Sequence, residues 1–202
     1  AFLEIAPDGR VKLWSPTTEM GQGIHTGHAM VIAEELGVPL ADVSVEPANP
    51  APAFRRGSGA NASMGSGGSW GMRAWAGPLR KAAAQARAAL LAEAAAAHGL
   101  PMAELDIVDG RIVHKGATVG SIGALARGAA LRELSAEPAL RPTRRLAGSS
   151  QPRLDLPSKV DGTRQFAGDV RLPGLVYAAI RHGPIDKAEL VEFNPFNARG
   201  IR

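Results

Sequence analysis

Cysteine is absent from this chain of 202 residues, and that absence excludes several classes of protein. A disulfide framework, a zinc site with thiolate ligands and an iron–sulfur cluster bound within the chain all require cysteine. Aromatic residues are also scarce, at 4%, whereas glycine and proline number 24 and 15. This composition predicts many turns, glycine-lined loops and close packing of small side chains.

Long apolar runs and strong net charge are lacking as well. No run reaches the roughly 18 apolar residues that a membrane helix needs, and the first residues lack a signal-peptide pattern. We therefore predict no membrane span. If an export signal was removed before residue 1, we expect a periplasmic protein. Without such a signal, we expect a cytoplasmic one. The net charge is only +4, and the basic run 141–145 is interpreted as a solvated linker rather than a nucleic-acid surface.

The first part of the chain predicts a hairpin, a helix and a further strand. Residues 2–5 and 11–14 are mainly apolar and flank an Asp-Gly turn, which is typical of a β-hairpin. Apolar residues at helical spacing follow Gly23 and stop at Gly37, so we expect a helix there. Residues 43–46 then predict a strand.

The middle of the chain predicts a long loop and a long helix. Residues 47–71 contain three prolines and many glycines, serines and asparagines, and a loop of this length is usually functional or disordered. The interval from Pro78 to Gly99 predicts a helix of about five to six turns. Its apolar stripe comprises Leu79, Ala83, Ala86, Leu90 and Ala94, and its solvent-exposed face comprises Arg80, Lys81, Arg87 and Glu93.

The last part of the chain predicts a second hairpin, a short helix, a linker and two strands. The hairpin turns at Asp109-Gly110, and the short helix covers residues 122–130. Periodicity disappears over residues 133–157, which indicates a linker between domains. Beyond it, two strands are expected at 166–172 and 175–181, joined by a type II turn at Pro173-Gly174.

The segment from Glu19 to Gly27 places Gln22 between glycines directly ahead of the first predicted helix. Glycine lets a ligand approach the backbone, and the free N–H groups at a helix start attract anions, especially phosphate. Gln22 adds an amide, and Thr26 adds a hydroxyl or a helix cap. An ordinary capped turn is the alternative. Neither Gly-x-Gly-x-x-Gly in a βαβ unit nor a Walker lysine follows, which excludes nicotinamide and ATP sites.

Residues 65–73 form a second glycine-rich stretch ahead of a helix. Its backbone N–H groups, two hydroxyls and the Arg73 guanidinium would suit phosphate oxygens, with a flexible loop as the alternative. His25 and His28 lie three residues apart, but no third ligand at a matching spacing completes a metal site. Trp70 and Trp75 are interpreted as packing residues.

In combination, these motifs resemble the isoquinoline oxidoreductase beta-subunits, a branch of the molybdenum-cofactor subunits of the xanthine dehydrogenase family. The segments that carry this resemblance are 19–27, Ala33-Glu34-Glu35-Leu36, 66–73 and Pro78-Leu79-Arg80-Lys81-Ala82. Residues 152–157, Lys159-Val160-Asp161-Gly162, 169–174 and Tyr177-Ala178-Ala179 resemble the opening of that family's hammerhead domain. The resemblance covers essentially the whole chain.

The resemblance implies an α+β fold of mixed sheets with packed helices, followed by the start of an α/β hammerhead domain. The implied domains are a molybdopterin-dinucleotide-binding segment at 1–132, a linker at 133–157 and the opening of the hammerhead at 158–202. The implied cofactor contacts are Gly21, Gln22, Gly23 and Thr26 in one region and Ser66, Gly67, Gly68 and Ser69 in another. Relatives commonly carry hydroxyl residues where this chain has Trp70 and Gly71, so the second region departs from the family pattern.

The resemblance also implies part of a molybdenum-dependent oxidoreductase that oxidises an aldehyde or an N-heterocycle. The cofactor would be molybdenum with molybdopterin cytosine dinucleotide. The partners would be the remainder of the molybdenum subunit, a subunit with [2Fe-2S] clusters and, as a further electron acceptor, a cytochrome c subunit. The family's catalytic glutamate lies near the carboxyl end of a longer subunit, so no catalytic or metal-binding residue is assigned here, and Glu19, Glu34 and Glu35 are not taken for it.

Two other functions stay compatible with the sequence. A non-redox module that binds phosphate or nucleotides would use both glycine stretches without an electron-transfer partner. A degenerate, structural relative is suggested by Trp70 and Gly71 in the second stretch. The resemblance itself leaves open whether the chain is a fragment, a processed piece or one subunit of a split protein.

Overall fold

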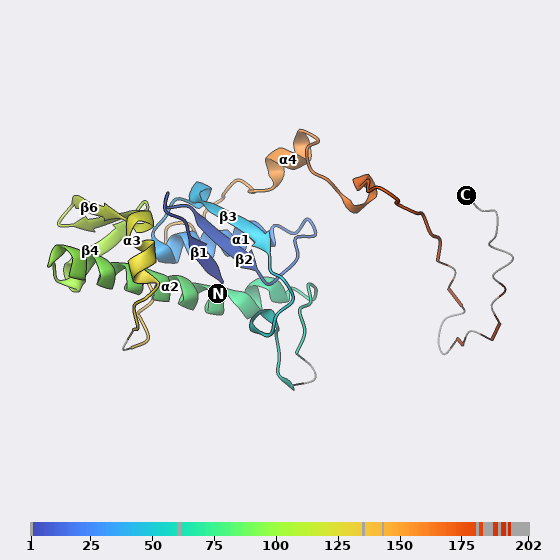
Figure 1. Ribbon diagram of the computed structural model, residues 1–202, viewed down its shortest axis with the longest axis horizontal. Coiled ribbons are helices and arrows are strands. Elements are labelled where there is room, and N and C mark those ends of the chain that lie inside the picture. Colours follow the sequence, from blue (N-terminus) through green and yellow to red (C-terminus); the bar gives the residue numbers. More distant parts are fainter. Residues whose placement is uncertain are drawn as a thin grey trace. The chain divides into compact units, whose positions relative to one another are not determined.

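The computed structural model describes residues 2–59, 62–134, 136–142, 144–180, 182–183, 188–189, 191–192 and 194. The chain divides into two compact units, residues 1–161 and 162–202, and each is described by itself. The first unit contains every described strand and α-helix (Figure 1). It has an α+β architecture in which two small sheets pack on helices, as the sequence predicts.

The first sheet has the order β1-β2-β3. The hairpin of β1 (Leu3–Ile5) and β2 (Val11–Ser15) is confirmed, with the tight turn made possible by Gly9 at φ 90°. The predicted helix is α1 (Ile24–Leu36), and it ends at Gly37 as expected. It connects β2 to β3 (Val43–Pro47), which pair in parallel. A helical crossover of this kind is what parallel neighbours require.

The long helix α2 (Trp70–His98) begins eight residues before the predicted start at Pro78, so that prediction is wrong. Pro78 lies inside the helix with its ring exposed, and it removes only one backbone N–H donor. The residue before it is Gly77, which has no Cβ to clash with the proline ring. The extra turns bury Trp75, which is 8% exposed. No described helix is long and apolar enough to cross a membrane.

The second sheet is an antiparallel meander of β4 (Leu105–Val108), β5 (Arg111–His114) and β6 (Ala117–Ser121). Asp109 and Gly110 both have positive φ, as the predicted hairpin turn requires. The third strand, β6, was not predicted. The short helix α3 (Ile122–Ala129) is confirmed, and the Ser121 hydroxyl caps it by accepting a hydrogen bond from the Ala124 amide at 3.3 Å.

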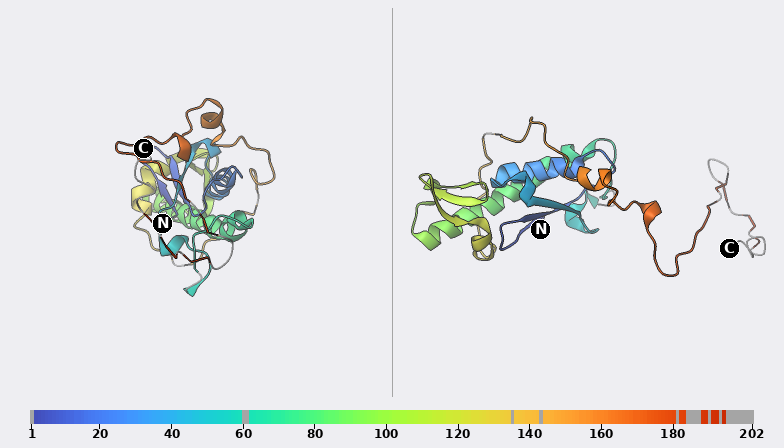
Figure 2. Two further views of the ribbon diagram at one scale, coloured as in Figure 1. Left: turned by 90° about the vertical axis from the view of Figure 1, so that its right-hand side faces the viewer. Right: turned by 90° about the horizontal axis from the view of Figure 1, so that it is seen from above.

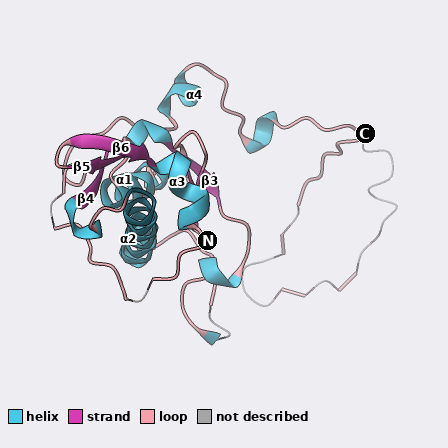
Figure 3. Ribbon diagram, turned by 60° about the vertical axis from the view of Figure 1, so that its left-hand side comes forward, coloured by secondary structure: helices cyan, strands magenta, loops and turns pink. Residues whose placement is uncertain are grey.

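Both α1 and α3 pack on α2, as the view along α2 shows (Figure 3). The predicted apolar stripe of α2 is buried, apart from Ala86, which is half-buried. The predicted solvent-exposed face is wrong in part. Arg80 and Arg87 instead turn toward the buried carboxylate of Glu35, at 2.8 and 3.1 Å. The carboxylate is 1% exposed, so burying it requires these cationic partners.

The interpretation of the basic run 141–145 as solvated is wrong for Arg141. Its guanidinium lies 2.7 Å from the Asp106 carboxylate, and its backbone amide donates to Glu35 at 2.9 Å. Farther along, the amides of Leu146 and Ala147 donate to the Glu34 carboxylate at 3.0 and 3.1 Å. The described residues 136–142 and 144–155 contain no strand and no helix, and α4 (Leu156–Val160) follows them. They run along α1, from Glu35 near its end to Thr26 near its start, and we call them the strap (Figure 2). The predicted domain boundaries stay a prediction.

The two predicted strands of the second unit are not present in the described residues 162–180. A single 3-10 turn covers Ala167–Asp169. The Pro173-Gly174 turn is confirmed, because Gly174 has φ 74° and the Leu175 amide donates to the Leu172 carbonyl at 3.1 Å. A two-stranded hairpin is marginal without further strands or a helix to cover its apolar face. Residue 181, the end of the second predicted strand, lies outside the described residues.

Candidate cofactor site

The first glycine loop, residues 19–23, is closed by a carboxylate of its own. Glu19 accepts hydrogen bonds from the amides of Gly21 at 2.8 Å, Gly23 at 2.9 Å and His25 at 3.1 Å. Burial raises the pKa of Glu19, but these three bonds outweigh it and hold the pKa below its ordinary value. The expectation that the first N–H groups of α1 stay free for a ligand is therefore wrong for Gly23 and His25. Gly21 and Gly23 have φ of 103° and 80°, a conformation that favours glycine.

Gln22 and Thr26 already have partners within the chain. The Gln22 side chain accepts from the Met20 amide at 2.6 Å and donates to the Thr18 carbonyl at 2.9 Å. Thr26 is 7% exposed, and its hydroxyl accepts from the Leu154 amide at 3.1 Å. An amide has two donors and a hydroxyl keeps its own proton, so each side chain retains a donor. Gln22 is exposed, so its second donor is accessible to a ligand.

The second glycine loop, residues 65–69, lies directly against the first. The Ser66 hydroxyl accepts a hydrogen bond from the Thr18 amide at 2.7 Å. Gly68 and Ser69 both have left-handed backbone conformations, with φ of 56° and 58°, and they lead straight into α2. Ser69 makes no side-chain cap, and no acidic residue lies in the first turn of α2. Within the described part of the chain, the amides of Gly71 and Met72 make no hydrogen bond to a loop carbonyl or to a side chain.

His28 links α1 to strand β2 and to the start of α2 from inside the core. This side chain is 0% exposed, with Nδ1 3.0 Å from the Ser15 hydroxyl and Nε2 3.3 Å from the Gly71 carbonyl. Burial lowers the pKa of His28 to about 4, so the imidazole is neutral at pH 7. His25 instead bonds the Thr17 carbonyl at 2.9 Å. The two histidines are three residues apart in the sequence, but each has its own hydrogen-bond partners in the fold.

Arg153 belongs to this region although no sequence pattern marked it as a site residue. Its Nη1 donates to the Gly21 carbonyl at 2.7 Å, and its Nη2 lies 3.4 Å from the Glu19 carboxylate. Asp155 holds the guanidinium in a two-point contact at 3.0 and 2.9 Å, and the pKa of that carboxyl is well below its ordinary range because of this hydrogen bonding. The strap therefore ends on the outer side of the first glycine loop. In the sequence, Arg153 is marked only by Asp155 two residues later, a spacing that allows the two side chains to pair.

Glu34 and Glu35, like Glu19, have structural partners. Glu34 accepts from amides of the strap, and Glu35 binds Arg80 and Arg87. All three carboxylates are thus engaged within the chain. That none of them is the catalytic base stays a prediction.

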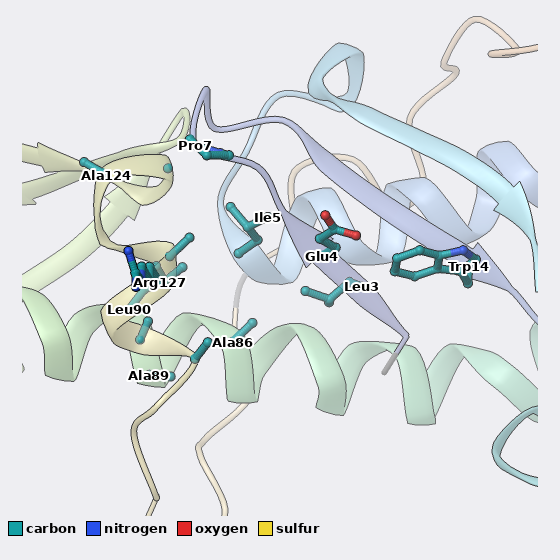
Figure 4. Close-up of a pocket in the computed structure, with 14 residues that line it drawn as sticks. Leu3, Glu4, Ile5, Pro7, Trp14, Ala86, Ala89, Leu90, Ala124 and Arg127 are labelled. Carbon is teal, nitrogen blue, oxygen red and sulfur yellow. The ribbon is translucent and has the colours of Figure 1, made fainter.

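An apolar groove of about 790 Å³ lies elsewhere in the first unit, between β1, α2 and α3 (Figure 4). The side chains of Leu3 and Ile5 extend from β1 toward α2, where Ala86 and Leu90 line the opposite wall. None of the eight predicted cofactor contacts lines it. Its apolar lining does not suit an anionic ligand.

Comparison with known proteins identifies the family. The chain belongs to the molybdopterin cofactor-binding domain family, which it matches over residues 1–156. Over 91% of its length it is 32% identical to a subunit of the nicotinate dehydrogenase of Pseudomonas putida (strain KT2440). Over the same share it is 28% identical to the beta chain of the isoquinoline 1-oxidoreductase of Brevundimonas diminuta. The chain spans 15% and 28% of the length of these two relatives.

A third relative and two solved structures extend the comparison. A membrane-bound aldehyde dehydrogenase of Gluconacetobacter polyoxogenes is 28% identical over 91% of this chain and 24% of its own length. CO dehydrogenase from Oligotropha carboxidovorans aligns with 68% of this chain and 17% of its own, at 26% identity and a TM-score of 0.49. Quinoline 2-oxidoreductase from Pseudomonas putida 86 gives the same coverages, 22% identity and a TM-score of 0.48.

Proposed function

We propose that the two glycine loops together hold the molybdopterin dinucleotide of a molybdenum hydroxylase. The observation that carries this proposal is the hydrogen bond between the Thr18 amide and the Ser66 hydroxyl. It brings the loops to one place, next to the start of α2, where backbone N–H groups in the described part of the chain lack an internal acceptor. A ligand rich in phosphate and polar edges fits such a surface.

The residues present fit this cofactor in different ways. The amides of residues 67–69 and the start of α2 would bind phosphate oxygens. Gln22 would donate its second amide hydrogen, and the glycines at 21 and 23 would let the ligand approach the backbone. Thr26 has a narrower role, because its hydroxyl already accepts from the strap and only its proton is left. We propose the cytosine form of the dinucleotide, on the basis of the family resemblance.

The whole protein is proposed to oxidise an N-heterocycle or an aldehyde, by analogy with the relatives named above. When bound, the molybdenum cofactor supplies oxygen transfer to carbon and accepts the two electrons that leave the substrate. This chain orients the cofactor, and the catalytic glutamate is expected in the remainder of the molybdenum subunit. This chain has no cysteine and so cannot ligate an iron–sulfur cluster itself. We propose that the [2Fe-2S] clusters belong to a partner subunit, with a cytochrome c subunit as a further acceptor.

A test combines Gln22→Ala with Ser69→Ala in the assembled molybdenum protein. Pterin is measured by fluorescence after oxidation, cytidine nucleotide by chromatography and molybdenum by elemental analysis. We expect all three to fall together, by about tenfold, because each lost contact weakens retention of the cofactor.

The matched control is Gln85→Ala with Thr118→Ala, which removes the same kinds of group from exposed positions of α2 and β6. Full retention of pterin in the Gln22 and Ser69 variant would contradict the proposal. It would favour the degenerate relative, in which these loops have only a structural role.

A further inference from the structure

Two arginines and a tryptophan meet at the start of α2. The guanidinium carbons of Arg56 and Arg73 lie 5.0 and 4.7 Å from the centre of the Trp70 ring. Both arginines therefore make cation–π contacts with a single indole. We call these three residues the Arg-Trp-Arg cluster. None of them is among the eight predicted cofactor contacts, although the sequence already suggested a phosphate partner for Arg73.

The cluster has positive charge without a counter-ion. No carboxylate in the described part of the chain forms an ion pair with either arginine. Nη1 of Arg56 is buried and has no hydrogen-bond partner there, although it is an obligatory donor. The first turn of α2 adds the positive end of a 29-residue helix and no acidic side chain. Like charges held together in this way repel one another, and a bound anion would offset that repulsion.

The cluster adjoins the second glycine loop. The Trp70 ring lies so close to the Gly68 backbone that a Cβ on Gly68 would come within 3.0 Å of Cδ1 and 3.3 Å of Nε1. A side chain at this position would displace the ring and, with it, the two guanidinium groups. A ligand held by the amides of residues 67–69 therefore lies beside the cluster. Guanidinium groups bind phosphate oxygens through paired, charge-assisted hydrogen bonds.

We propose that the Arg-Trp-Arg cluster binds phosphate groups of the dinucleotide, with Trp70 holding Arg56 and Arg73 in position. The inference rests on the proposed function and adds to it which part of the cofactor is recognised and by which side chains. It also gives a physical role to Trp70. Its indole contacts both guanidinium groups and so orders two charged donors beside the loop.

The test titrates the 202-residue chain with inorganic pyrophosphate and with cytidine diphosphate in a calorimeter. We expect the double variant Arg56→Gln with Arg73→Gln to weaken both affinities by about tenfold or more, because two charge-assisted contacts are lost. Added chloride should weaken wild-type binding and have less effect on the variant. The matched control is Arg111→Gln on β5, which removes an exposed arginine of the other sheet and should leave both affinities unchanged.

Nuclear magnetic resonance then places the ligand. The chain has three tryptophans, so it gives three indole N–H signals, and the Trp70 signal is identified by its loss in Trp70→Phe. We expect pyrophosphate and cytidine diphosphate to shift the Trp70 signal and to leave that of Trp14 in place. A shift with cytidine diphosphate but none with pyrophosphate would assign the nucleoside to the cluster and overturn the inference. Unchanged affinity in the double variant would also overturn it.

Two further results separate this inference from the proposed function. If the assembled, cofactor-loaded protein still shows the Trp70 shift with added pyrophosphate, the cluster is a site for free phosphate and the inference fails, while pterin retention through Gln22 and Ser69 stands. If the assembled wild-type protein contains no pterin, the proposed function fails. The assignment to the dinucleotide fails with it, and the pyrophosphate titration then shows whether an anion site exists at the cluster.

Discussion

The starts of α1 and α2 show two different uses of the same sequence pattern. Each helix follows a glycine loop with left-handed residues at its end. At α1 the amides are bound by the Glu19 carboxylate, so the loop is closed and its shape is fixed by the chain itself. At α2 no carboxylate is present in the first turn, and two arginines gather instead. The charge at the start of α2 therefore favours an anionic ligand. The loop at the start of α1 instead has a fixed shape that a ligand can pack against.

The two helix starts also depend on each other. His28 from α1 reaches the Gly71 carbonyl at the start of α2, and Ser66 receives the Thr18 amide. Gly71 lies so close to α1 that a Cβ there would come within 2.7 Å of the Ile24 side chain. The closed start thus serves as the support on which the second one is positioned.

Removing His28 should break this arrangement most severely. We expect His28→Ala to lower the free energy of unfolding by about 3 kcal/mol, since it leaves a cavity and removes the partners of Ser15 and the Gly71 carbonyl. Urea denaturation followed by circular dichroism measures the effect. His98→Ala, at the exposed end of α2, is the control and should cost well under half as much. Equal losses in the two variants would show that the link from His28 to β2 and to the start of α2 does not stabilise the fold.

Removing the Glu19 carboxylate should make the start of α1 resemble that of α2, where the first turn has no acidic residue. Glu19→Ala leaves the amides of Gly21, Gly23 and His25 without their acceptor, and we expect a loss of about 2 kcal/mol. Sulfate, compared with chloride at equal ionic strength, should then stabilise the variant more than the wild type. The reason is that the freed N–H groups can donate to the sulfate oxygens. An identical sulfate response in both proteins would argue that Glu19 does not occupy an anion site.

Local patterns predicted the elements of the first unit well. The Asp-Gly turns, the glycine that ends α1 and the period-2 strands depend on neighbouring residues, and the structure confirms them. The start of α2 was missed because Pro78 is a strong local signal, whereas burial of Trp75 depends on the rest of the fold. Strand β6 was missed because its local signal is weak. It is short, and it forms by pairing with β5.

The site was only partly predictable for similar reasons. Glycines near a helix start are visible in the sequence, so both loops were selected as candidates. Which of the two starts is already bound by an internal carboxylate depends on the path of the chain around Glu19, which no spacing reveals. The contributions of Arg153 and Arg56 arise from residues far apart in the sequence that meet only after folding. The eight predicted contact residues stay a prediction, which the pterin measurement on the Gln22 and Ser69 variant tests.

Acid should weaken the His28 link between α1 and the start of α2 before it affects the carboxylates. His28 has its folded pKa lowered to about 4 from an ordinary value of 6.5, so the folded state resists protonation. Stability is then fully present above about pH 6.5 and is lost as the pH falls toward the folded pKa of about 4. Between pH 7 and pH 5.5 we expect a loss of about 1 kcal/mol. His28→Gln should flatten the stability curve in this interval, and an unchanged slope would assign the effect to another group.

Removing the hydrogen bond between Thr18 and Ser66 should have the smallest effect on stability, but it tests most directly how the two loops are aligned. Ser66→Ala removes an exposed acceptor, so we expect a loss of only about 0.5 kcal/mol, because water replaces the hydroxyl at the Thr18 amide. Hydrogen exchange of that single amide should nevertheless accelerate, and Ser66→Thr should restore its protection because threonine retains the hydroxyl. Ser58→Ala, on the exposed part of the preceding loop, is the control. Equally fast exchange of Thr18 in the Ser66 and Ser58 variants would show that the Ser66 hydroxyl does not hold the loops together.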